Sequence, residues 1–258
     1  METSTDLYPA ERQRHILAQI NRNGRASVAE LSQLFGVSEV TIRADLQTLV
    51  AGDLIVRTHG GAVLASRAPE LSLTLRRQQQ VDAKERIGTA AAEFVANGDA
   101  VFLDASSTAL ALAHALRQRR DLTILTHSLV VAQSLLDASG VTVVMTGGTL
   151  QRETVSLMGT EGLAILHKYN LKTGFFGAHG LSFPEGLTDV SAGEAEVKRQ
   201  VVALCRQVVA LIDVTKWGRV GPASFAHPRD LHVIVTDTQA PAGLVEQARA
   251  LGTRVMQV

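Results

Sequence analysis

The chain has 258 residues, 46% of them hydrophobic, and its 25 Lys and Arg residues balance its 25 Asp and Glu residues. This length fits one small domain and one larger domain, each with its own core. A formal net charge of zero excludes a global attraction to nucleic acid, so DNA binding would depend on local basic residues. The single cysteine, Cys205, excludes an internal disulfide framework and is expected to be a small buried residue of a helix.

The beginning of the sequence has neither the basic nor the apolar segment of a signal peptide. No apolar run reaches the length that spans a bilayer. We therefore expect a soluble, cytoplasmic protein without a membrane partner. We also expect no cofactor and no metal, since the eight histidines repeat no metal-ligand spacing.

Residues 12–20 and 28–35 have the one-sided apolar spacing of two short helices. Ser27 and Glu30 have the spacing of a capping box at the start of the second helix. The side chains that we expect to point inward from this helix are Val28, Leu31, Leu34 and Phe35.

A third helix should begin after a tight turn at Gly36, with Ser38 as its N-cap. Its inward side chains would be Ile42, Leu46 and Leu49. The opposite face is small and uncharged, unlike the Glu- and Lys-rich face of an ordinary surface helix, and suits a helix that lies in a major groove. The residues that we expect to contact bases or phosphates are Ser38, Val40, Thr41, Arg43 and Gln47.

Residues 54–57 and 62–64 are predicted strands around a turn whose glycines supply positive φ angles. Arg57 and His59 would lie near the tip of this hairpin and contact phosphates or the minor groove. Helix pairs joined by a glycine are common, and alone would favour a purely structural motif. The capping box, the third helix and the hairpin together favour a winged helix-turn-helix DNA-binding domain over residues 8–66.

Residues 67–80 are expected to link this domain to a second domain over residues 81–258. The end of the link fits an extended strap or a helix, in which Arg76 and Arg77 would be solvated, with contact to DNA phosphate as the alternative. Residues 84–96 have the pattern of an amphipathic helix.

In the second domain, short runs rich in Val, Ile and Leu alternate with helical segments, most of them expected to have 10 to 15 residues. The runs are residues 100–104, 122–125, 141–145, 173–177, 208–213, 232–237 and 253–256. Most are continuous, which indicates strands buried on both faces. The predicted fold class is therefore α/β, with the winged helix-turn-helix domain joined to an open, mostly parallel, Rossmann-like sheet.

Polar residues follow most of these runs, at the sheet edge where α/β proteins bind ligands. Ser, Thr and Gly before a helix can hold a phosphate, His and Lys add positive charge, and Asp suits sugar hydroxyls. The resulting effector-binding candidates are Asp104, Ser106, Ser107, Thr108, Thr126, His127, Ser128, Gly147, Gly148, His179, Lys198, Asp213 and Lys216.

Each candidate also has a purely structural interpretation. Ser106–Thr108 is suited to capping a helix, Gly147–Gly148 to an ordinary turn, and each histidine, taken singly, to a structural role. Glu194 and Lys198 are four residues apart and alone would favour a surface salt bridge. The recurrence of polar loops after nearly every run is what favours a binding site.

The chain resembles the DeoR family of bacterial transcriptional repressors from about Glu11 to Asp237. In the first domain the matching residues are Glu11–Leu17, Leu31–Ser38, Thr41–Arg43, Asp45–Leu46 and Arg57–Ala62. In the second domain they are Asp104–Thr108, Thr126–Ser128, Gly147–Thr149, Gly177–Gly180, Glu194–Arg199 and Asp213–Gly218. The set and its order are far more specific than any single motif.

The resemblance implies a repressor of a carbohydrate-utilisation operon that binds double-stranded operator DNA. It also implies a sensor domain, similar to sugar-phosphate isomerases, for a phosphorylated sugar or polyol, and a homo-oligomer that is a dimer or tetramer. A dimer would place its recognition helices about 34 Å apart, or a multiple of this, on a palindrome. The alternative function is a sugar-phosphate isomerase-like enzyme, although no nucleophile–base arrangement is evident. Its acid–base residues would be Asp104, His179, Lys198 and Asp213.

Four residues depart from the family's usual pattern. Ala44 lies on the outward face of the third helix, where the family commonly has a second arginine, and this implies one fewer cationic contact with DNA. Ser107, His127 and His179 replace Gly, Asn and Asp in the ligand loops, and therefore affect which ligand the domain accepts.

Overall fold

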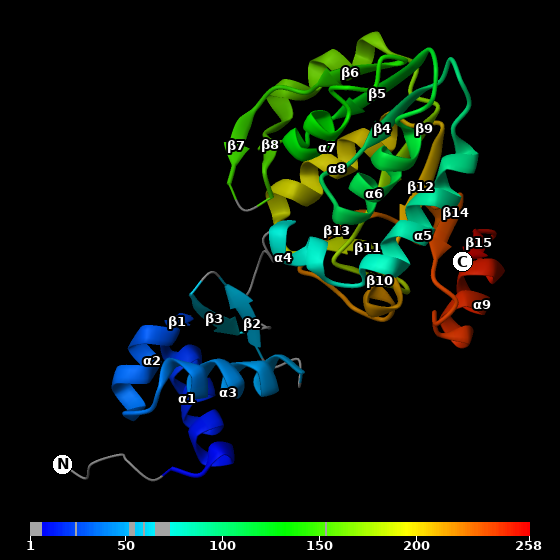
Figure 1. Cartoon of the computed structure of the whole chain (residues 1–258). Helices are drawn as coiled ribbons and strands as arrows, with labels where there is room; N and C mark the ends of the chain where they lie inside the picture. The colour runs from blue at the N-terminus through cyan, green and yellow to red at the C-terminus, as the bar shows by residue number, and fades with distance from the viewer. Residues whose placement is uncertain (1–6, 24, 52–54, 59, 65–72, 153) are drawn as a thin grey trace. The chain divides into compact units, whose positions relative to one another are not determined.

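The chain forms two compact units, Met1–Leu71 and Ser72–Val258, each with its own core (Figure 1). The computed structural model describes residues 7–23, 25–51, 55–58, 60–64, 73–152 and 154–258. Helix α4 (Leu73–Gln78) belongs to the second unit, although it falls within the segment that we expected to be a linker. In the described part of the chain, no helix has both the length and the apolar character to cross a membrane.

The described residues of the first unit form three helices and three short strands. They are α1 (Pro9–Asn23), β1 (Arg25–Ser27), α2 (Val28–Phe35), α3 (Glu39–Ala51), β2 (Ile55–Thr58) and β3 (Gly61–Leu64). The three helices and the hairpin predicted from the sequence are confirmed. The fully buried centre of this unit is formed by Ile16, Ile20, Leu31, Ile42 and Leu46.

Local hydrogen bonds confirm the predicted starts of α2 and α3. The Oγ of Ser27 accepts from the N–H of Glu30 at 3.1 Å, and the Oε2 of Glu30 accepts from the N–H of Ser27 at 2.8 Å, which is a complete capping box. Gly36 ends α2 in the left-handed region at φ 63°. The Oγ of Ser38 then accepts from the N–H of Thr41 at 3.1 Å and caps α3.

One predicted core residue of this unit is wrong. Leu34 is 52% exposed, whereas Val28, Leu31 and Phe35 are buried. At 100° per residue, Leu34 lies about 90° from the centre of the face that these three residues share, so it falls on the flank of α2.

Strand β1 has no counterpart in the sequence prediction, because three residues carry too little pattern. It pairs antiparallel with β3, so that the sheet order is β1-β3-β2. A Cβ on Gly61 would lie 2.3 Å from the carbonyl oxygen of Ala26, so this close pairing of backbones requires glycine. Gly60 has φ 86°, as the predicted hairpin turn requires.

The second unit is built on a seven-stranded sheet. Its strands are β4 (Ala100–Leu103), β5 (Leu122–Thr126), β6 (Val141–Met145), β9 (Thr173–Phe176), β12 (Gln207–Leu211), β14 (Val233–Thr236) and β15 (Arg254–Gln257). All seven predicted strands are confirmed, every pairing is parallel, and the order is β15-β14-β12-β9-β4-β5-β6. The chain runs outward from β4 to β6 and then returns to continue from β9, so the order reverses between β4 and β9. This is the switch point at which such sheets bind ligands.

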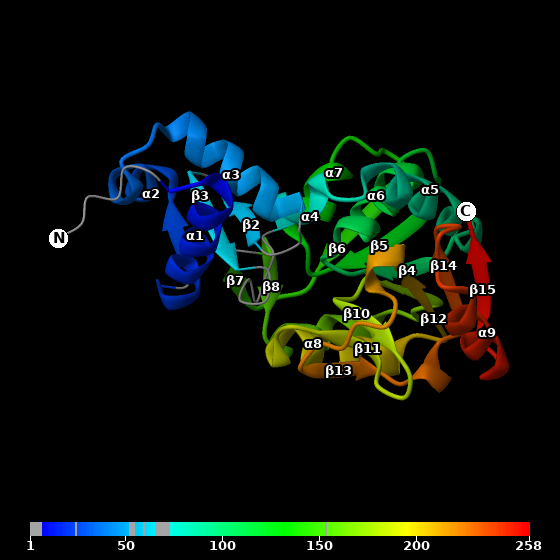
Figure 2. The same ribbon diagram turned by 90° about the horizontal axis from the view of Figure 1, so that it is seen from below.

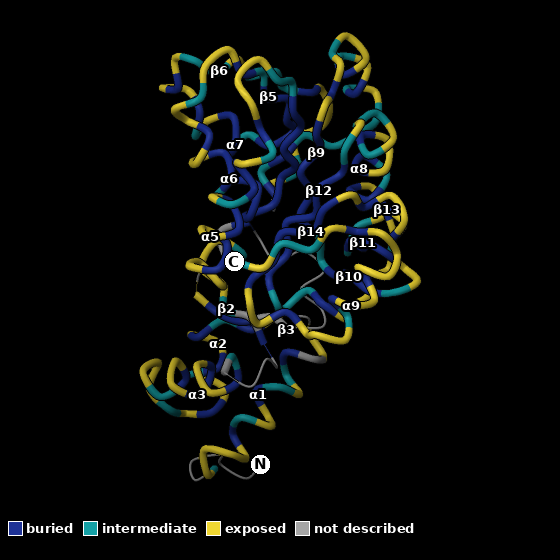
Figure 3. The backbone as a smooth tube through the Cα atoms, turned by 90° about the vertical axis from the view of Figure 1, so that its right-hand side faces the viewer, coloured by how far each residue is buried: buried dark blue, intermediate teal, exposed yellow. Residues whose placement is uncertain are grey.

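Both faces of the sheet are covered (Figure 2). On one face lie α5 (Val81–Ala91), α6 (Ser107–Leu116) and α7 (Leu129–Ser134), and on the other lie α8 (Ala192–Leu204) and an antiparallel sheet of β10 (Gly180–Ser182), β11 (Gly186–Asp189) and β13 (Ala223–Ala226). Val101 and Leu103 pack toward the first layer and Phe102 toward the second, so every residue of β4 after Ala100 is buried. Figure 3 shows the central strands β9, β12 and β14 in dark blue, which explains their continuous apolar sequences.

The connections between strands differ from the predicted helices of 10 to 15 residues. Helices α6 and α8 have 10 and 13 residues, but α7 and α9 (Ala242–Ala250) have 6 and 9. The chain from β6 to β9 instead forms a hairpin of β7 (Thr149–Gln151) and β8 (Ser156–Met158), followed by a 3₁₀ helix (Thr160–Lys168). From β12 to β14 it forms short 3₁₀ helices around β13. These segments lack a regular hydrophobic period, and so gave no clear signal.

Two further expectations about this unit need adjustment. The helix predicted over residues 84–96 begins earlier, at Val81, and its last turn is a 3₁₀ helix (Ala92–Phe94). Cys205 lies directly after α8 and not within a helix, and it is only partly buried.

Candidate functional site

The outward face of α3 is exposed, as its sequence predicted. Val40 is 76% exposed and Gln47 is also exposed, while Ile42 and Leu46 are fully buried on the opposite side. Arg43 forms an exposed ion pair with Glu39, with 3.0 Å from Nη2 to Oε2. Exposed pairs of this kind contribute little free energy, so Arg43 can exchange Glu39 for a phosphate or a base at small cost.

The hairpin contributes one of its predicted contact residues to the same surface. Nη1 of Arg57, from β2, donates to Oε1 of Gln47 at 3.4 Å. The hydroxyls of Ser38 and Thr41 lie 2.9 Å apart at the start of α3. The structure therefore brings Arg57 beside the predicted recognition residues. His59 lies outside the described residues.

A buried ion pair that the sequence analysis missed fixes α3 against α1. Nε of Arg12 lies 2.5 Å from Oδ2 of Asp45, and Nε2 of Gln13 donates to Oδ1 of Asp45 at 3.1 Å. Both charged residues are more than 90% buried. The signal in the sequence was an aspartate on the inward arc of α3, directly before Leu46.

At the switch point of the second unit, Asp104 joins three elements. It follows β4 and is fully buried. Its Oδ1 accepts from the N–H of Ser106 at 3.0 Å, and its Oδ2 accepts from the N–H of Gly177 at 2.9 Å, after β9. The Nζ of Lys198, from α8, lies 3.1 Å from the same Oδ2.

Lys198 is the centre of this cluster and not part of a surface salt bridge. Its Nζ also lies 2.7 Å from Oδ2 of Asp189 and 3.9 Å from Oε1 of Glu194, and it donates to the carbonyl oxygen of Gly177 at 3.1 Å. Burial alone would lower the pKa of Lys198, but the carboxylates of Asp189, Asp104 and Glu194 together raise this pKa well above its ordinary value. Lys198 therefore stays charged, and its N–H groups are directed to protein oxygens.

The predicted hydroxyl loops serve as helix caps. The Oγ of Ser106 accepts from the N–H of Ala109 at 3.1 Å, and the Oγ of Ser128 accepts from the N–H of Val131 at 3.2 Å. The Oγ1 of Thr126 accepts from the N–H of Ser128 at 3.0 Å. Ser107 and Thr108 lie buried in the first turn of α6, where backbone N–H groups have no partner within the helix.

His127, in the second of these loops, is fully buried. Its ring stacks on Phe102 with centroids 5.7 Å apart and an interplanar angle of 13°. Neither ring nitrogen has a hydrogen-bond partner among the described residues. Burial lowers the pKa of His127 to about 4, although nearby Asp104 acts to raise it, so the imidazole is neutral at neutral pH.

Four residues carry the buried side-chain nitrogens and oxygens that have no hydrogen-bond partner in the described part of the chain. They are Arg76 (Nε and Nη2), His127 (Nδ1 and Nε2), Thr146 (Oγ1) and Glu194 (Oε1). An unpaired buried polar group costs about 1–3 kcal/mol, so native proteins keep such groups where a ligand or water satisfies them. This concentration is the strongest indication of a ligand site in the unit.

Arg76 corrects the expectation of a solvated side chain on the linker. It lies on α4, which packs against α6, and it is only partly exposed. Its charge acts on the pKa values of His179, Asp189, Glu194 and Lys216, so the guanidinium lies within electrostatic range of the switch point. Sequence reasoning missed this because α4 is too short to show which way its arginines point.

Two lysines complete the positive side of the site. The Nζ of Lys84 donates to the carbonyl oxygens of Arg76 and Gln79, both at 2.6 Å, and so holds α4 against α5. Burial lowers the pKa of Lys84 to about 8. Lys216 follows β12, and burial lowers its pKa too, against the opposing effect of Asp213.

The remaining candidates are more clearly structural. Oδ1 of Asp213 accepts from the N–H of Thr215 at 2.9 Å and caps a short 3₁₀ helix (Val214–Lys216). Gly148 has φ 127°, and a Cβ there would lie 2.2 Å from the carbonyl oxygen of Met158. Gly147 donates its N–H to the carbonyl oxygen of Gly162 at 3.3 Å. Close backbone packing thus accounts for this glycine pair.

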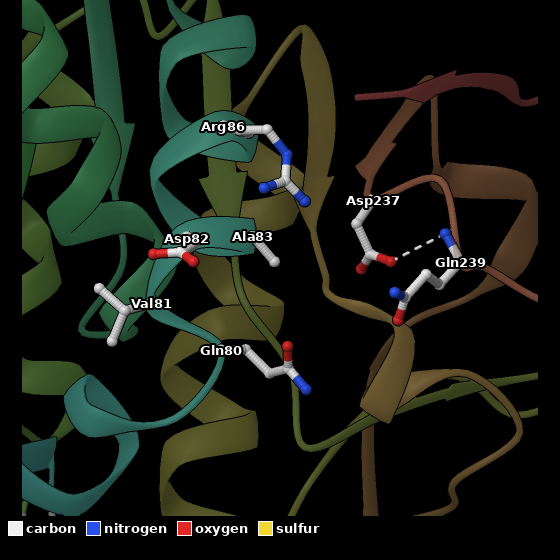
Figure 4. A pocket seen from close by; sticks show the side chains of 7 residues that line it. All are labelled: Gln80, Val81, Asp82, Ala83, Arg86, Asp237 and Gln239. Carbon is white, nitrogen blue, oxygen red and sulfur yellow. Dashed lines mark hydrogen bonds between the residues drawn. The ribbon is translucent and has the colours of Figure 1, made fainter.

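A separate open cavity of about 340 Å³ lies beside the carboxyl end of β14 (Figure 4). Its lining residues are Gln80, Val81, Asp82, Ala83, Arg86, Asp237 and Gln239. Asp237 already accepts from the N–H groups of Gln239 at 3.0 Å and Val214 at 2.6 Å. None of the predicted effector residues lines this cavity, and it holds none of the unpaired buried groups.

Two family descriptions cover most of the chain. The DeoR-like helix-turn-helix domain matches residues 12–68, and the DeoR C terminal sensor domain matches residues 79–238. The chain belongs to the DeoR family. This DeoR-family protein is thus a DNA-binding transcriptional regulator with a sensor domain, as its sequence motifs predicted.

Curated relatives of this DeoR-family protein are similar over nearly their whole length. The HTH-type transcriptional regulator GolR of Listeria innocua serovar 6a is 34% identical over 96% of this chain and 98% of that protein. The glycerol-3-phosphate regulon repressor of Escherichia coli (strain K12) is 31% identical over 91% of this chain and 94% of that protein. The putative aga operon transcriptional repressor of Escherichia coli O157:H7 is 29% identical over 96% of this chain and 94% of that protein.

Among solved structures, ribose 5-phosphate isomerase A from Methanocaldococcus jannaschii is 17% identical, over 54% of this chain and 55% of that chain, with a TM-score of 0.42. This likeness is too weak to support a statement about function.

Proposed function

We propose that this DeoR-family regulator represses carbohydrate-use genes, and that a phosphorylated sugar or polyol bound at the switch point of its second unit changes its affinity for the operator. The observation that carries the proposal is the group of unpaired buried polar atoms on Arg76, His127, Thr146 and Glu194, at the carboxyl edge of a parallel sheet. The names of two relatives, the glycerol-3-phosphate regulon repressor and the aga operon repressor, support the same class of function.

The phosphate would bind at the positive side of this site. Arg76 has two unpaired guanidinium nitrogens, and Lys216 and His179 lie within electrostatic range of it. The first turn of α6, with Ser107 and Thr108, supplies backbone N–H groups and the positive end of a helix dipole. A guanidinium can bind a phosphate through two parallel hydrogen bonds, which favours Arg76 as the main contact.

Operator DNA would bind to the exposed face of α3 and the adjacent hairpin. The proposed contact residues described by the structure are Ser38, Val40, Thr41, Arg43, Gln47 and Arg57. Because the chain has no net positive charge, one copy offers few phosphate contacts. We therefore propose a dimer or tetramer, in which two recognition helices read one palindromic operator.

The geometry of the switch point fits a protein that binds its effector without catalysing a reaction on it. The acid–base candidates Asp104 and Lys198 form an ion pair with each other and hydrogen bonds to the backbone of Gly177, and Asp213 caps a helix. These contacts hold the groups away from the proton transfers that an isomerase needs. Turnover of pentose or hexose phosphates by the purified protein would instead favour the alternative function, a sugar-phosphate isomerase-like enzyme.

The test is an operator-binding titration. Fluorescence anisotropy would follow a labelled operator duplex while a panel of phosphorylated sugars and polyols, with their unphosphorylated forms, is added. We expect at least one phosphorylated compound to change the affinity, since a ligand acts only through its different affinities for two states of the protein. If no compound in a broad panel changes the affinity, the sensing proposal is wrong.

A further inference from the structure

We infer that His127, Thr146 and Glu194 form a subsite that reads uncharged hydroxyl groups of the effector and rejects a carboxylate at the same position. The inference rests on the proposed function and narrows the ligand class that it names. It starts from three side chains, each at least 97% buried, that carry polar atoms without a hydrogen-bond partner among the described residues.

The three side chains come from adjoining parts of the switch point. Thr146 follows β6, and its N–H donates to the carbonyl oxygen of Thr126, the residue before His127, at 3.0 Å. Glu194, in the first turn of α8, has its Oε1 3.9 Å from the Nζ of Lys198. Lys198 in turn contacts Asp104 at 3.1 Å, and Asp104 follows β4, the strand next to β5. These contacts join the three groups to a single region of the switch point.

Oε1 of Glu194 can accept a hydrogen bond, and the other two groups can both donate and accept one. A threonine hydroxyl does so at any pH, and a neutral imidazole has one N–H and one free nitrogen. Burial lowers the pKa of His127 to about 4, which keeps the ring neutral. Sugar and polyol hydroxyls both donate and accept, so they can pair with all three groups.

A carboxylate would meet an unfavourable field in this subsite. Asp104 and Asp189 already lie 3.1 Å and 2.7 Å from Lys198, so its single positive charge is more than matched. A further negative charge beside Glu194 would add repulsion in a region shielded from water. Arg76, whose Nε and Nη2 have no hydrogen-bond partner among the described residues, is engaged by the phosphate in the proposed function, and so does not offset this repulsion.

The experiment compares ligands that differ only at the end opposite the phosphate, which would occupy this subsite. Two matched pairs are glycerol 3-phosphate with 3-phosphoglycerate, and glucitol 6-phosphate with 6-phosphogluconate. Each pair exchanges one CH₂OH group for a carboxylate and keeps the carbon chain and the phosphate. Thermal shift and calorimetry on the full chain would measure binding of all four compounds. We expect at least one of the two alcohols to bind, with an affinity about tenfold or more above that of its acid partner.

Two variants test the residues themselves. Thr146→Val removes the unpaired hydroxyl and keeps the shape of the side chain. It should weaken binding of the alcohol about fivefold to tenfold, while the melting temperature without ligand is unchanged or higher, because a buried polar group without a partner is lost. Thr142→Val, at an exposed position of β6, the strand that Thr146 follows, is the matched control and should bind like the unsubstituted protein.

The outcomes separate this inference from the proposed function. Equal binding within the pairs, a preference for the acids, or unchanged binding by Thr146→Val overturns the hydroxyl subsite and leaves the sensor proposal standing. If none of the four compounds, nor any member of the wider sugar-phosphate panel, stabilises the protein, the proposed function fails and the subsite fails with it.

Discussion

The residues of the switch point divide into those that build the site and those that remain available to a ligand. Asp104 and Lys198 belong to the first group, because they form an ion pair with each other and hydrogen bonds to the backbone of Gly177. Arg76 and His127 belong to the second, because they keep nitrogens that have no hydrogen-bond partner among the residues that the structure describes. A charged residue in a ligand loop is therefore not automatically a ligand contact.

Substitution of Asp104 should act on stability. Asp104→Ala removes one partner of a buried ion pair and leaves two backbone N–H groups unpaired, so we expect the free energy of unfolding of the second unit to fall by about 3–5 kcal/mol. Chemical denaturation measures this change. Asp137→Ala, at an exposed position, is the control. A stable Asp104→Ala protein that had lost only its response to effector would contradict this role.

His127 should make stability depend on pH. Its pKa is about 4 in the folded protein against an ordinary 6.5, so the unfolded chain binds the proton first as pH falls. The contribution is present above pH 6.5 and is lost between pH 6.5 and 4, and it amounts to about 3 kcal/mol. Denaturation across this range, compared between the unsubstituted protein and His127→Asn, isolates the effect from other titrating groups. Parallel curves for the two proteins would contradict the prediction.

Among the elements, α3 has an outward face made mainly of small or uncharged side chains. Its buried face and its ion pair from Asp45 to Arg12 fix its orientation in the unit. Its outward face carries Val40, Ala44 and Gln47, with Arg43 as its one cation. The hairpin places Arg57 beside Gln47, so two elements share the proposed DNA surface.

Arg43→Ala should weaken operator binding by at least about tenfold at physiological salt, because it removes the cation of α3. Ligand binding to the second unit should be unchanged. Arg22→Ala removes an exposed arginine from the last turn of α1 and serves as the charge-matched control. Unchanged operator affinity in Arg43→Ala would refute the assignment of α3 as the recognition helix.

Ala44→Arg should have the opposite effect. Ala44 is exposed, so the longer side chain can reach a phosphate without disturbing the core. We expect tighter DNA binding and a salt dependence that is steeper by about one ion. Anisotropy titrations at several salt concentrations measure both quantities, and no change in the slope would place position 44 away from the backbone of DNA.

At the scale of the whole molecule, function requires two separately packed units to influence one another. One carries the proposed DNA surface and the other the switch point, and α4, with Arg76, is the first helix of the second unit. A ligand that engages Arg76 would therefore act at the end of the second unit that is nearest in sequence to the DNA-binding unit. Communication through this end, and through an oligomer, is the proposed route of control.

Lys216→Ala should separate sensing from DNA binding. The variant loses positive charge at the phosphate side of the site, so operator affinity should stay near that of the unsubstituted protein while the response to effector falls at least about tenfold. Lys168→Ala, an exposed lysine at the end of a 3₁₀ helix, is the control. A full response from Lys216→Ala would exclude Lys216 from the effector site.

The sequence by itself determined the family, the class of fold, the helices of the first unit and all seven parallel strands. These features depend on local signals, such as the Ser27–Glu30 capping box, the turn at Gly36 and continuous apolar runs, which neighbouring residues are enough to produce. Only the tertiary structure decided which polar residues are consumed by the fold. The Nζ of Lys198 has ion-pair partners, whereas atoms of Arg76 and Glu194 have no hydrogen-bond partner among the described residues. This difference depends on groups far away in the sequence, which only the packing of the chain brings together.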